Sequence, residues 1–343
     1  MPCQPVLAAE SGSRVVCPPV EVSFFIPSHY LPDQARRKVW QQGGPVELLQ
    51  GGKAACAQCW IYQTCTALNA AGFSARLTTD FPKEGIVVAL AGNLAPGFRP
   101  PEGVFLVGVA ADGLPHPSAQ CHILQNRASL RFLREAVFMP LWPQPGLVAR
   151  DPARGEQFQK VAFYGDPPNL APEIAEPAFA KHLAEDLHLD FEILPAPRWH
   201  DYSQTDCAIA IRSFSKKPYL LKPSTKMINA WLAGVPFLGG MDSAFASDGR
   251  PGTNYLPCPD PATMLAHLKR LRSEPAFRAG LVEAGRAASM VFSPARLTRR
   301  WIDFLENHAH PRAQRWLRAG RTSRALSRLH MRVATALFAR WIS

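Results

Sequence analysis

The stretch LLKPSTKMINAWLAGVPFLGG, residues 220–240, decides how the whole chain is interpreted. A Ser-Thr pair, Ser224 and Thr225, follows a proline and precedes an apolar series at helical spacing, so a helix is predicted to begin there. Its first turn holds no carboxylate, and Lys222 and Lys226 flank a start where the helix dipole is already positive. A bound anion would remove this repulsion, so the stretch suggests an anion site.

Short strand-like runs alternate with helical patterns on both sides of this stretch. The expected strands are residues 21–27, 74–80, 85–90, 104–110, 121–126, 160–166, 190–194, 207–212, 235–240 and 254–258. The expected helices are residues 56–71, 172–187, 224–233 and 261–271. This order is typical of an α/β protein with parallel sheets covered by helices on both faces.

A segment rich in proline, glycine and charge, residues 140–158, predicts a domain boundary. We expect two doubly wound, Rossmann-like domains, residues 1–150 and 151–306, that face each other across a cleft, and a helical tail over residues 307–343. Ligands of such sheets bind at the carboxyl ends of the strands, where Arg212 ends a run. Arg212, Lys222 and Lys226 would converge there on free helix amides, which suits a diphosphate. Alternatively, the lysines are solvated or pair with acids elsewhere.

Composition narrows the class of protein. With 343 residues and 47% hydrophobic content, the chain can form two domains. It has no basic start followed by an apolar run, and no segment approaches the ~20 apolar residues of a membrane span, so we expect a soluble, cytoplasmic protein. Eight cysteines lack the spacing of a disulfide framework. Cys56 and Cys59 form a C-x-x-C, but a helical context and the absence of a second pair favour buried thiols over a metal site.

Several of these segments together resemble the donor-site region of GT-B glycosyltransferases. The resemblance rests on DCAIAIR (206–212), KPSTKMINAWLAGVPFLGG (222–240) and MDSAF (241–245). The same region is similar to the segment with which fucosyltransferases of this fold hold their nucleotide. More weakly, WPQPGLVARDPARG (142–155) and VAFYGDPPNLAPE (161–173) resemble the linker and first strand of the second domain in uncharacterised bacterial members of the superfamily.

The resemblance implies a binding site for a sugar nucleotide in the second domain, opposite an acceptor side in the first. Its donor-binding positions are Arg212, Lys222, Ser224, Thr225, Lys226, Asn229, Asp242 and Ser243. Asp242 lies in the loop where many retaining members have a glutamate, and its shorter side chain leaves the stereochemistry open. The implied activity is transfer of a hexose or related sugar from a nucleotide-diphosphate donor to an acceptor hydroxyl, without a cofactor. No Asp-x-Asp motif is present, so a metal-independent reaction is expected.

An inverting enzyme would also need a base from the first domain. The candidates are Asp112 and His116 in AADGLPHPSAQ, which follows an expected strand, and His122 in CHILQN. The alternative for Asp112 and His116 is turn chemistry beside glycine and proline. Trp199 could stack on a nucleotide base or form part of a half-buried connector. Glycine pairs at residues 43–44 and 51–52 are expected to punctuate a loop or to let the backbone approach a ligand.

Two other functions remain open on the same fold. One is a non-catalytic module that binds a nucleotide sugar or scaffolds a cell-surface polysaccharide assembly. The other is a sugar-nucleotide epimerase, which would need acids and bases around the sugar itself. Nucleic acid is a weaker alternative, because the arginines of the tail have no interleaved aromatic residues on a sheet.

The positive charge is concentrated at the end of the chain. Eight arginines and no acid lie in residues 307–343, of a net charge of +11. At about 100° per residue, one side of a helix carries Leu326, Leu329, Val333, Leu337 and Trp341, and the other carries Arg321, Arg324, Arg328 and Arg332. Residues 312–343 are therefore expected to associate peripherally with an anionic membrane surface, near a glycan or lipid-linked acceptor, or else to pack their apolar side on the first domain.

Overall fold

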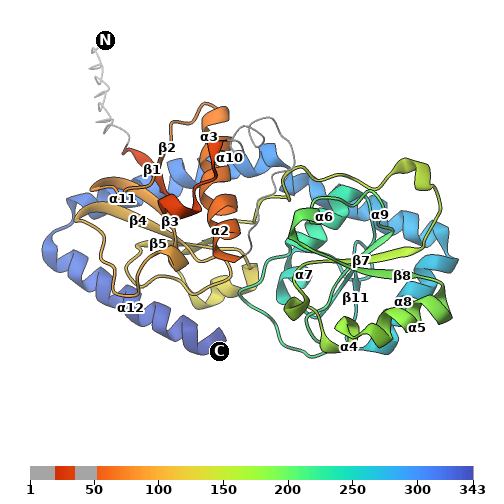
Figure 1. Ribbon diagram of the computed structural model, residues 1–343. Coiled ribbons are helices and arrows are strands. Elements are labelled where there is room, and N and C mark those ends of the chain that lie inside the picture. The colour runs from red at the N-terminus through yellow and green to blue at the C-terminus, as the bar shows by residue number, and fades with distance from the viewer. Residues whose placement is uncertain (1–19, 35–51, 343) are drawn as a thin grey trace, which may run out of the picture.

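The computed structural model describes residues 20–34 and 52–342, which form two lobes, each built on a parallel sheet (Figure 1). The loop predicted around the glycine pairs at residues 43–44 and 51–52 lies almost entirely outside these residues. The α/β architecture with two doubly wound domains and helices at the C-terminal end is confirmed.

The first sheet has six parallel strands in the order β2-β1-β3-β4-β5-β6. They are β1 (Val22–Phe25), β2 (Arg76–Thr78), β3 (Glu84–Leu90), β4 (Gly103–Val109), β5 (Cys121–Leu124) and β6 (Ala136–Phe138). Five of the six were expected from their apolar runs. The edge strand β6 was not, because its three residues give too short a pattern.

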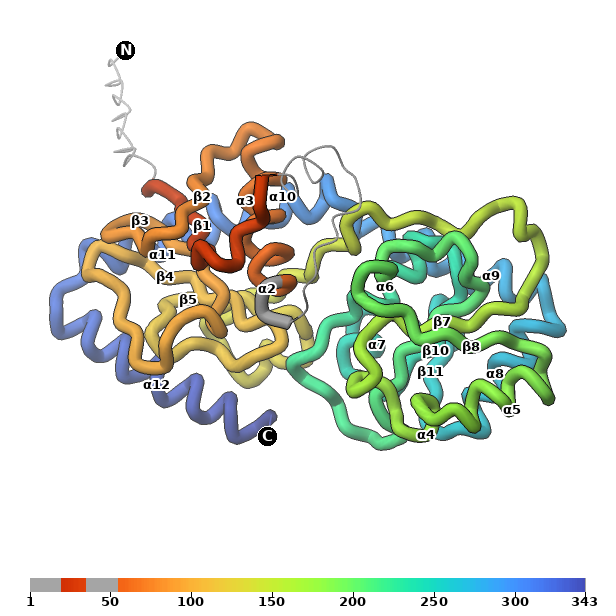
Figure 2. Tube along the Cα trace, in the orientation of Figure 1, coloured from red at the N-terminus to blue at the C-terminus, as the bar shows by residue number. Residues whose placement is uncertain are grey.

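Helices from both ends of the chain cover one face of this sheet. They are α2 (Gly52–Ala57), a π-helical turn (Gln58–Tyr62), α3 (Gln63–Ala70), α10 (Pro294–Phe304), a second π-helical turn (Leu305–Ala309) and α11 (His310–Arg318). Trp301 of α10 is fully buried, with its ring centroid 6.1 Å from that of Phe24 and 6.5 Å from that of Trp60. The return of the chain to the first lobe therefore begins before residue 306, and the tube trace shows this return in blue (Figure 2).

The second sheet has five parallel strands in the order β11-β10-β9-β7-β8. They are β7 (Lys160–Tyr164), β8 (Asp190–Leu194), β9 (Cys207–Ala210), β10 (Phe237–Gly239) and β11 (Leu256–Pro257). The α-helices of this lobe are α4 (Pro172–Ala175), α5 (Pro177–Leu187), α6 (Thr225–Ala233), α7 (Ser243–Asp248), α8 (Pro261–Ser273) and α9 (Pro275–Ser289). The single helix expected over residues 172–187 is two, because Pro177 forces Glu176 out of the helical region.

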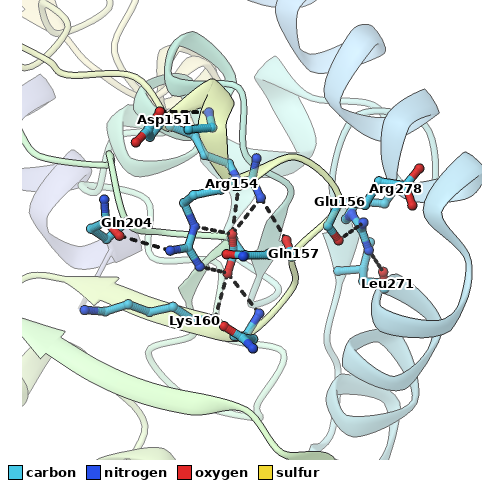
Figure 3. A network of polar contacts seen from close by, with 12 residues as sticks. Asp151, Arg154, Glu156, Gln157, Lys160, Gln204, Leu271 and Arg278 are labelled. Carbon is cyan, nitrogen blue, oxygen red and sulfur yellow. Dashed lines mark hydrogen bonds and ion pairs between the residues drawn. The ribbon is translucent and has the colours of Figure 1, made fainter.

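The segment between the lobes is held against the second sheet by a buried carboxylate, Asp206. Figure 3 shows the polar network to which the labelled Arg154, Gln157 and Lys160 belong. The oxygens of Asp206 accept hydrogen bonds from Arg150 at 3.0 Å, from Arg154 at 2.6 Å, and from the backbone N–H groups of Gln159 and Lys160 at 2.9 Å. Burial opposes ionisation of Asp206, but these donors together keep its pKa below the ordinary value. The linker is therefore a fixed part of the second lobe.

The last helix, α12 (Arg321–Ile342), runs along the outer edge of the first lobe and ends beside the junction of the lobes (Figure 1). One side of it packs on Ala110 after β4, on Leu124 at the end of β5 and on Leu133. Within the described residues, no helix is long and apolar enough to cross a membrane.

Candidate functional site

A cleft of about 490 Å³ lies between the lobes, where the carboxyl ends of the strands of both sheets meet. The first lobe lines it with residues that follow β3, β4 and β5, and with α2 and its π-helical turn. The second lobe contributes the residues after β7 and β9 and the start of α6. The predicted donor residues that line it are Arg212, Lys222, Thr225, Lys226 and Asn229.

Arg212 follows β9 and is fixed by two neighbours. Its Nε donates to Asp242 at 3.0 Å and its Nη1 donates to Asn169 at 2.9 Å. Its side chain is only 11% exposed, so the guanidinium is held in one orientation at the cleft wall. The buried Asp242 does not line the cleft, and its place behind Arg212 differs from the expectation that it meets the donor. Burial raises its pKa despite the guanidinium.

Lys226 lies in the first turn of α6 and faces the cleft without a carboxylate partner among the described residues. Burial and the charge of Arg212 lower the pKa of its ammonium group from 10.5 to about 8, although Asp112 and Asp166 act in the opposite direction. Its Nζ lies 5.5 Å from the centroid of the Phe163 ring. An anion that enters the cleft would stabilise the charged form of Lys226, and this interaction would favour anion binding.

The start of α6 is also left without a side-chain cap. Ser224 is the N-cap residue, but its hydroxyl donates to Asp248 at 2.6 Å and is turned away from the helix amides. The hydroxyl of Thr225 is buried without a partner in the structure, and Thr225 lines the cleft. The first amides of a helix have no intrahelical acceptor, so this end provides donors for an anion.

Asn229 and Ser243 hold other parts of the structure together. The side-chain oxygen of Asn229 accepts from the backbone N–H of Gln144 at 3.1 Å, which joins the linker to α6 beside the cleft. Ser243 begins α7 outside the cleft lining, and its hydroxyl accepts from Asn126 at 2.9 Å. Asn229 therefore lies at the cleft, whereas Ser243 lies outside it and bonds Asn126 of the first lobe.

Asp112 of the first lobe lies across the cleft from these cations. Its two oxygens accept from Gln125 at 2.6 Å and from Lys222 at 3.0 Å. The side chain of Asp112 is 48% exposed and that of Lys222 is 29% exposed. This ion pair therefore joins the two lobes and remains in contact with solvent. Asp112 is thus placed where an acceptor could reach it, whereas Lys222 already has a partner.

Comparisons with known proteins place this geometry among known folds. No protein-family model and no curated protein matches the sequence. HepE of Anabaena, in a crystal structure with UDP and glucose, matches with a TM-score of 0.52 and 13% identity over 83% of this chain and 99% of its own. AviGT4, a glycosyltransferase involved in avilamycin A biosynthesis, matches with a TM-score of 0.52 and 14% identity over 87% and 98%. Sucrose-phosphate synthase from Thermosynechococcus elongatus matches with a TM-score of 0.50 and 13% identity over 75% and 93%.

The chain has the GT-B fold. At this level of identity the matches establish the fold, and the function has to be argued from the cleft.

Within this GT-B framework, His116 and His122 are built into the first lobe. His116 is 5% exposed, its Nε2 bonds the Ala95 carbonyl at 2.9 Å, and its Nδ1 accepts from the Ser118 N–H at 3.2 Å. Both ring nitrogens are occupied, and His116 does not line the cleft, which differs from its expected role as a base. Burial lowers the pKa of His122 to about 4, so it is neutral at pH 7 and bonds the His116 carbonyl at 2.9 Å.

The two GT-B lobes are also joined by a strap, residues 219–222, that sequence reasoning did not identify. The Gln125 side chain donates to the Leu221 carbonyl at 2.8 Å, and the Asn126 side chain donates to the Lys222 carbonyl at 3.1 Å. Both follow β5, so a polar pair at a strand end was the available signal. These partners lie more than ninety residues apart, and no local pattern could have paired them.

Two further cleft residues were missed. Asn169 fixes Arg212, and Gly165 provides space, because a Cβ there would lie 2.8 Å from the Phe163 ring and 3.2 Å from the Lys226 side chain. Both belong to the loop after β7, whose position at a strand end is the signal that could have identified them.

Cys56 and Cys59 line the cleft as free thiols. Burial raises the pKa of Cys56 to about 11 and that of Cys59 to about 12, so both are protonated at pH 7. Across residues 20–34 and 52–342 there is no cluster of three or more His, Cys, Asp or Glu side chains able to hold a metal ion. With Trp60, these thiols make the first-lobe wall of the cleft largely apolar.

Proposed function

We propose that this protein is a glycosyltransferase that moves a sugar from a nucleotide-diphosphate donor to an acceptor hydroxyl. The proposal rests on two cations that lie at the same wall of the cleft. The guanidinium of Arg212 is held in one orientation, and the ammonium of Lys226 has no carboxylate partner among the described residues. Both face the cleft at the uncapped start of α6.

The donor diphosphate would lie against these groups. Arg212 and Lys226 would contact its oxygens, and the amides of the first turn of α6 and the Thr225 hydroxyl would donate further hydrogen bonds. The half-buried side chain of Trp199 lines the same cleft on the second lobe and offers surface for the nucleotide base. HepE, which shares the fold, has been crystallised with UDP and glucose, and this supports a uridine donor as the first to test.

The acceptor would enter from the first lobe. Asp112 is the carboxylate on that side of the cleft, among the residues that the structure describes, and it is exposed enough to accept a hydroxyl proton. We assign it this role in an inverting reaction. Asp242 would orient Arg212 rather than touch the sugar, because it is buried behind the guanidinium.

Charge on the leaving diphosphate would be stabilised by Arg212, Lys226 and the helix amides, which are in place before the reaction begins. We therefore expect turnover to persist in a chelator. Activity that disappears in EDTA and returns with magnesium or manganese would contradict this expectation.

The class of ligand can be tested by a thermal-shift panel of UDP, GDP, ADP and dTDP. One of these is expected to raise the melting temperature, since a ligand at 100 times its Kd adds about 2.7 kcal/mol to stability. The response should be lost in Arg212→Ala and kept in Lys216→Ala, a lysine that is exposed on the same loop and outside the cleft. If no nucleotide shifts the wild type, the proposed donor site is wrong.

Turnover then separates the remaining alternatives. The proposal predicts that the matching nucleotide sugar releases its nucleoside diphosphate when a glycan or lipid extract is added. Binding without release would favour a non-catalytic module, and conversion of the sugar without an acceptor would favour an epimerase.

A further inference from the structure

Helix α12 has two different apolar sides, of which only one is used by the fold. Met331, Thr335 and Phe338 are buried, and they pack with Leu124 and Leu133 of the first lobe. This side fixes the helix to the lobe. Removal of residues 312–343 would take away these contacts and Trp316, whose indole N–H bonds the Val104 carbonyl at 3.0 Å, so truncation is not a clean test of the tail.

The second apolar side is the row predicted from the sequence, and it lies in solvent. Its members are between 49% and 67% exposed: Leu326, Leu329, Val333, Leu337 and Trp341. Single exposed apolar residues are common, but five on one helix face form a continuous strip, which we call the α12 strip. The alternative in which this side packs on the first domain does not hold for Leu326, Leu329, Val333 and Leu337.

Positive charge lies within the α12 strip and on one flank of it. Arg340 is exposed within the strip, and at 100° per residue the exposed Arg332 and Arg321 lie about 60° and 80° beyond Leu329, between the strip and the buried side of the helix. Helix α12 contains no acidic residue, and none of these three arginines has a carboxylate partner among the described residues. The first lobe contacts this side of the helix at Trp341 and at His330, which bonds Glu135 at 2.8 Å. The other four residues of the strip lie outside the apolar cluster that anchors the helix: Leu326, Leu329, Val333 and Leu337.

Trp341 extends this surface onto the body of the lobe. Its ring stacks on Phe132 at a centroid distance of 5.9 Å, and the guanidinium of Arg131 lies 4.6 Å from the centroid of the Phe132 ring. Arg131 belongs to the short helix Arg127–Phe132, so a second element contributes a cation next to the strip.

We propose that the α12 strip and its arginines dock on an anionic lipid bilayer. The apolar row would enter the boundary between headgroups and acyl chains, Trp341 would lie at the headgroup level, and the arginines would meet lipid phosphates. A second copy of the chain fits less well, because strip-to-strip packing would bring two sets of arginines together without an acid on either helix.

Docking in this way would bring the cleft close to the bilayer. The buried side of α12 contacts Leu221 of the strap, and the next residue, Lys222, lines the cleft. A lipid-linked acceptor could then be reached without leaving the membrane. The docking surface itself stands on α12 and the neighbouring short helix, and it does not depend on the proposed glycosyl transfer.

The test is co-sedimentation of the full chain with vesicles of phosphatidylglycerol and phosphatidylcholine, and with vesicles of phosphatidylcholine only. Binding is expected to the anionic vesicles and to weaken as salt is raised from 0.05 to about 0.5 M, since screening shortens the range of the arginine charges. Arg321→Gln combined with Arg332→Gln should lower the vesicle partition coefficient by roughly tenfold or more.

The apolar contribution has a matched control. Val333→Glu with Leu337→Glu should abolish binding, whereas Met290→Glu with Val291→Glu should leave it unchanged. Met290 and Val291 are apolar and at least as exposed, but they belong to the short helix Met290–Phe292, outside α12 and the cluster that anchors it. Melting temperatures of both double variants verify that the fold is intact.

Two results would overturn the proposal. One is a wild-type chain that ignores anionic vesicles at low salt, and the other is equal binding by the two double variants. Sedimentation velocity without lipid provides a third measurement: a dimer that dissociates only in the Val333→Glu, Leu337→Glu variant would assign the strip to self-association instead.

Discussion

The second lobe has two basic clusters of similar composition, one in the linker and one at the cleft, which differ in how their carboxylates bond the cations. In the linker, Arg150 and Arg154 surround the buried Asp206, whose oxygens also accept from two backbone amides (Figure 3). In the cleft, the Asp242 carboxylate bonds Arg212, and Lys226 has no carboxylate partner among the described residues. Each cluster has two cations and one carboxylate, but both linker cations bond their carboxylate, whereas Lys226 of the cleft does not bond Asp242.

The pKa shifts express this difference. The pKa of Asp206 is lowered, because its donors outweigh its burial, so the charged form is favoured in the folded protein. The pKa of Lys226 is lowered to about 8, mainly by burial and then by Arg212, so its charged form is disfavoured. In a basic cluster that stabilises the fold, every cation bonds a carboxylate. In a basic cluster that can bind an anion, at least one cation has no carboxylate partner.

The largest effect is expected at the linker cluster. Asp206→Ala leaves two guanidinium groups without their carboxylate and should lower the free energy of unfolding by about 3–5 kcal/mol, measured by urea denaturation. Nucleotide affinity per folded molecule should not change. Glu156→Ala removes an exposed acid of the same segment and is the control, with an effect within about 0.5 kcal/mol. A loss below 1 kcal/mol in Asp206→Ala would contradict the structural role.

The pH dependence of stability sharpens this case. Because the folded pKa of Asp206 lies below its ordinary value of 3.8, its contribution is present at neutral pH and is lost as the pH falls from about 4 through the folded pKa. Asp206→Ala should lack that part of the acid-side loss.

The cleft cluster should behave in the opposite sense. Lys226→Met is expected to weaken binding of the nucleoside diphosphate by about 1.5–3 kcal/mol, which is roughly tenfold to a hundredfold in Kd. The same variant should be more stable than the wild type without ligand by about 1 kcal/mol at pH 7, because it removes a disfavoured buried charge. Lys216→Met is the control and should change neither quantity.

Alkaline pH provides a second check on Lys226. Between pH 8 and 10.5 the unfolded chain keeps a proton that the folded protein has released, so this group makes the wild type more stable as pH rises through that window. Lys226→Met should not show this gain. A Lys226→Met protein that is less stable at pH 7 and binds nucleotide normally would remove the distinction between the clusters.

The smallest effect is expected at Lys222, which has a partner but remains in contact with solvent. Its pair with Asp112 joins the lobes at 3.0 Å with both side chains partly exposed, and such pairs contribute about 0–1 kcal/mol. Lys222→Ala should therefore change the free energy of unfolding by less than about 1 kcal/mol and nucleotide affinity by less than Lys226→Met does. A larger loss of affinity than in Lys226→Met would make Lys222 the principal phosphate contact.

Much of the fold could be predicted because buried parallel strands are continuous apolar runs. The runs that become β3, β4, β7 and β9 are almost entirely buried, and each was identified from its sequence. The return of α10 to the first lobe was not, because nothing in its periodicity says that Trp301 packs between Phe24 and Trp60, more than two hundred residues earlier.

The candidate site divides in the same way. Arg212 and Lys226 were placed at the cleft because a strand end and a helix start fix where their backbones lie. Side-chain direction was beyond reach of the sequence: Ser224 turns to Asp248, and Asp242 turns to Arg212. These orientations depend on which distant partner satisfies a buried hydroxyl or carboxylate, and spacing along the chain does not encode that choice.

The central claim, that the cleft cations hold a diphosphate, is tested most directly by counting protons on binding. Calorimetric titration with the nucleoside diphosphate that stabilises the protein most, at pH 8.5 in two buffers of different ionisation enthalpy, measures this number. Most of Lys226 is neutral at this pH, and a bound diphosphate favours its charged form, so the account predicts uptake of roughly half a proton in the wild type and none in Lys226→Met. No uptake in the wild type, or equal uptake in both proteins, would contradict it.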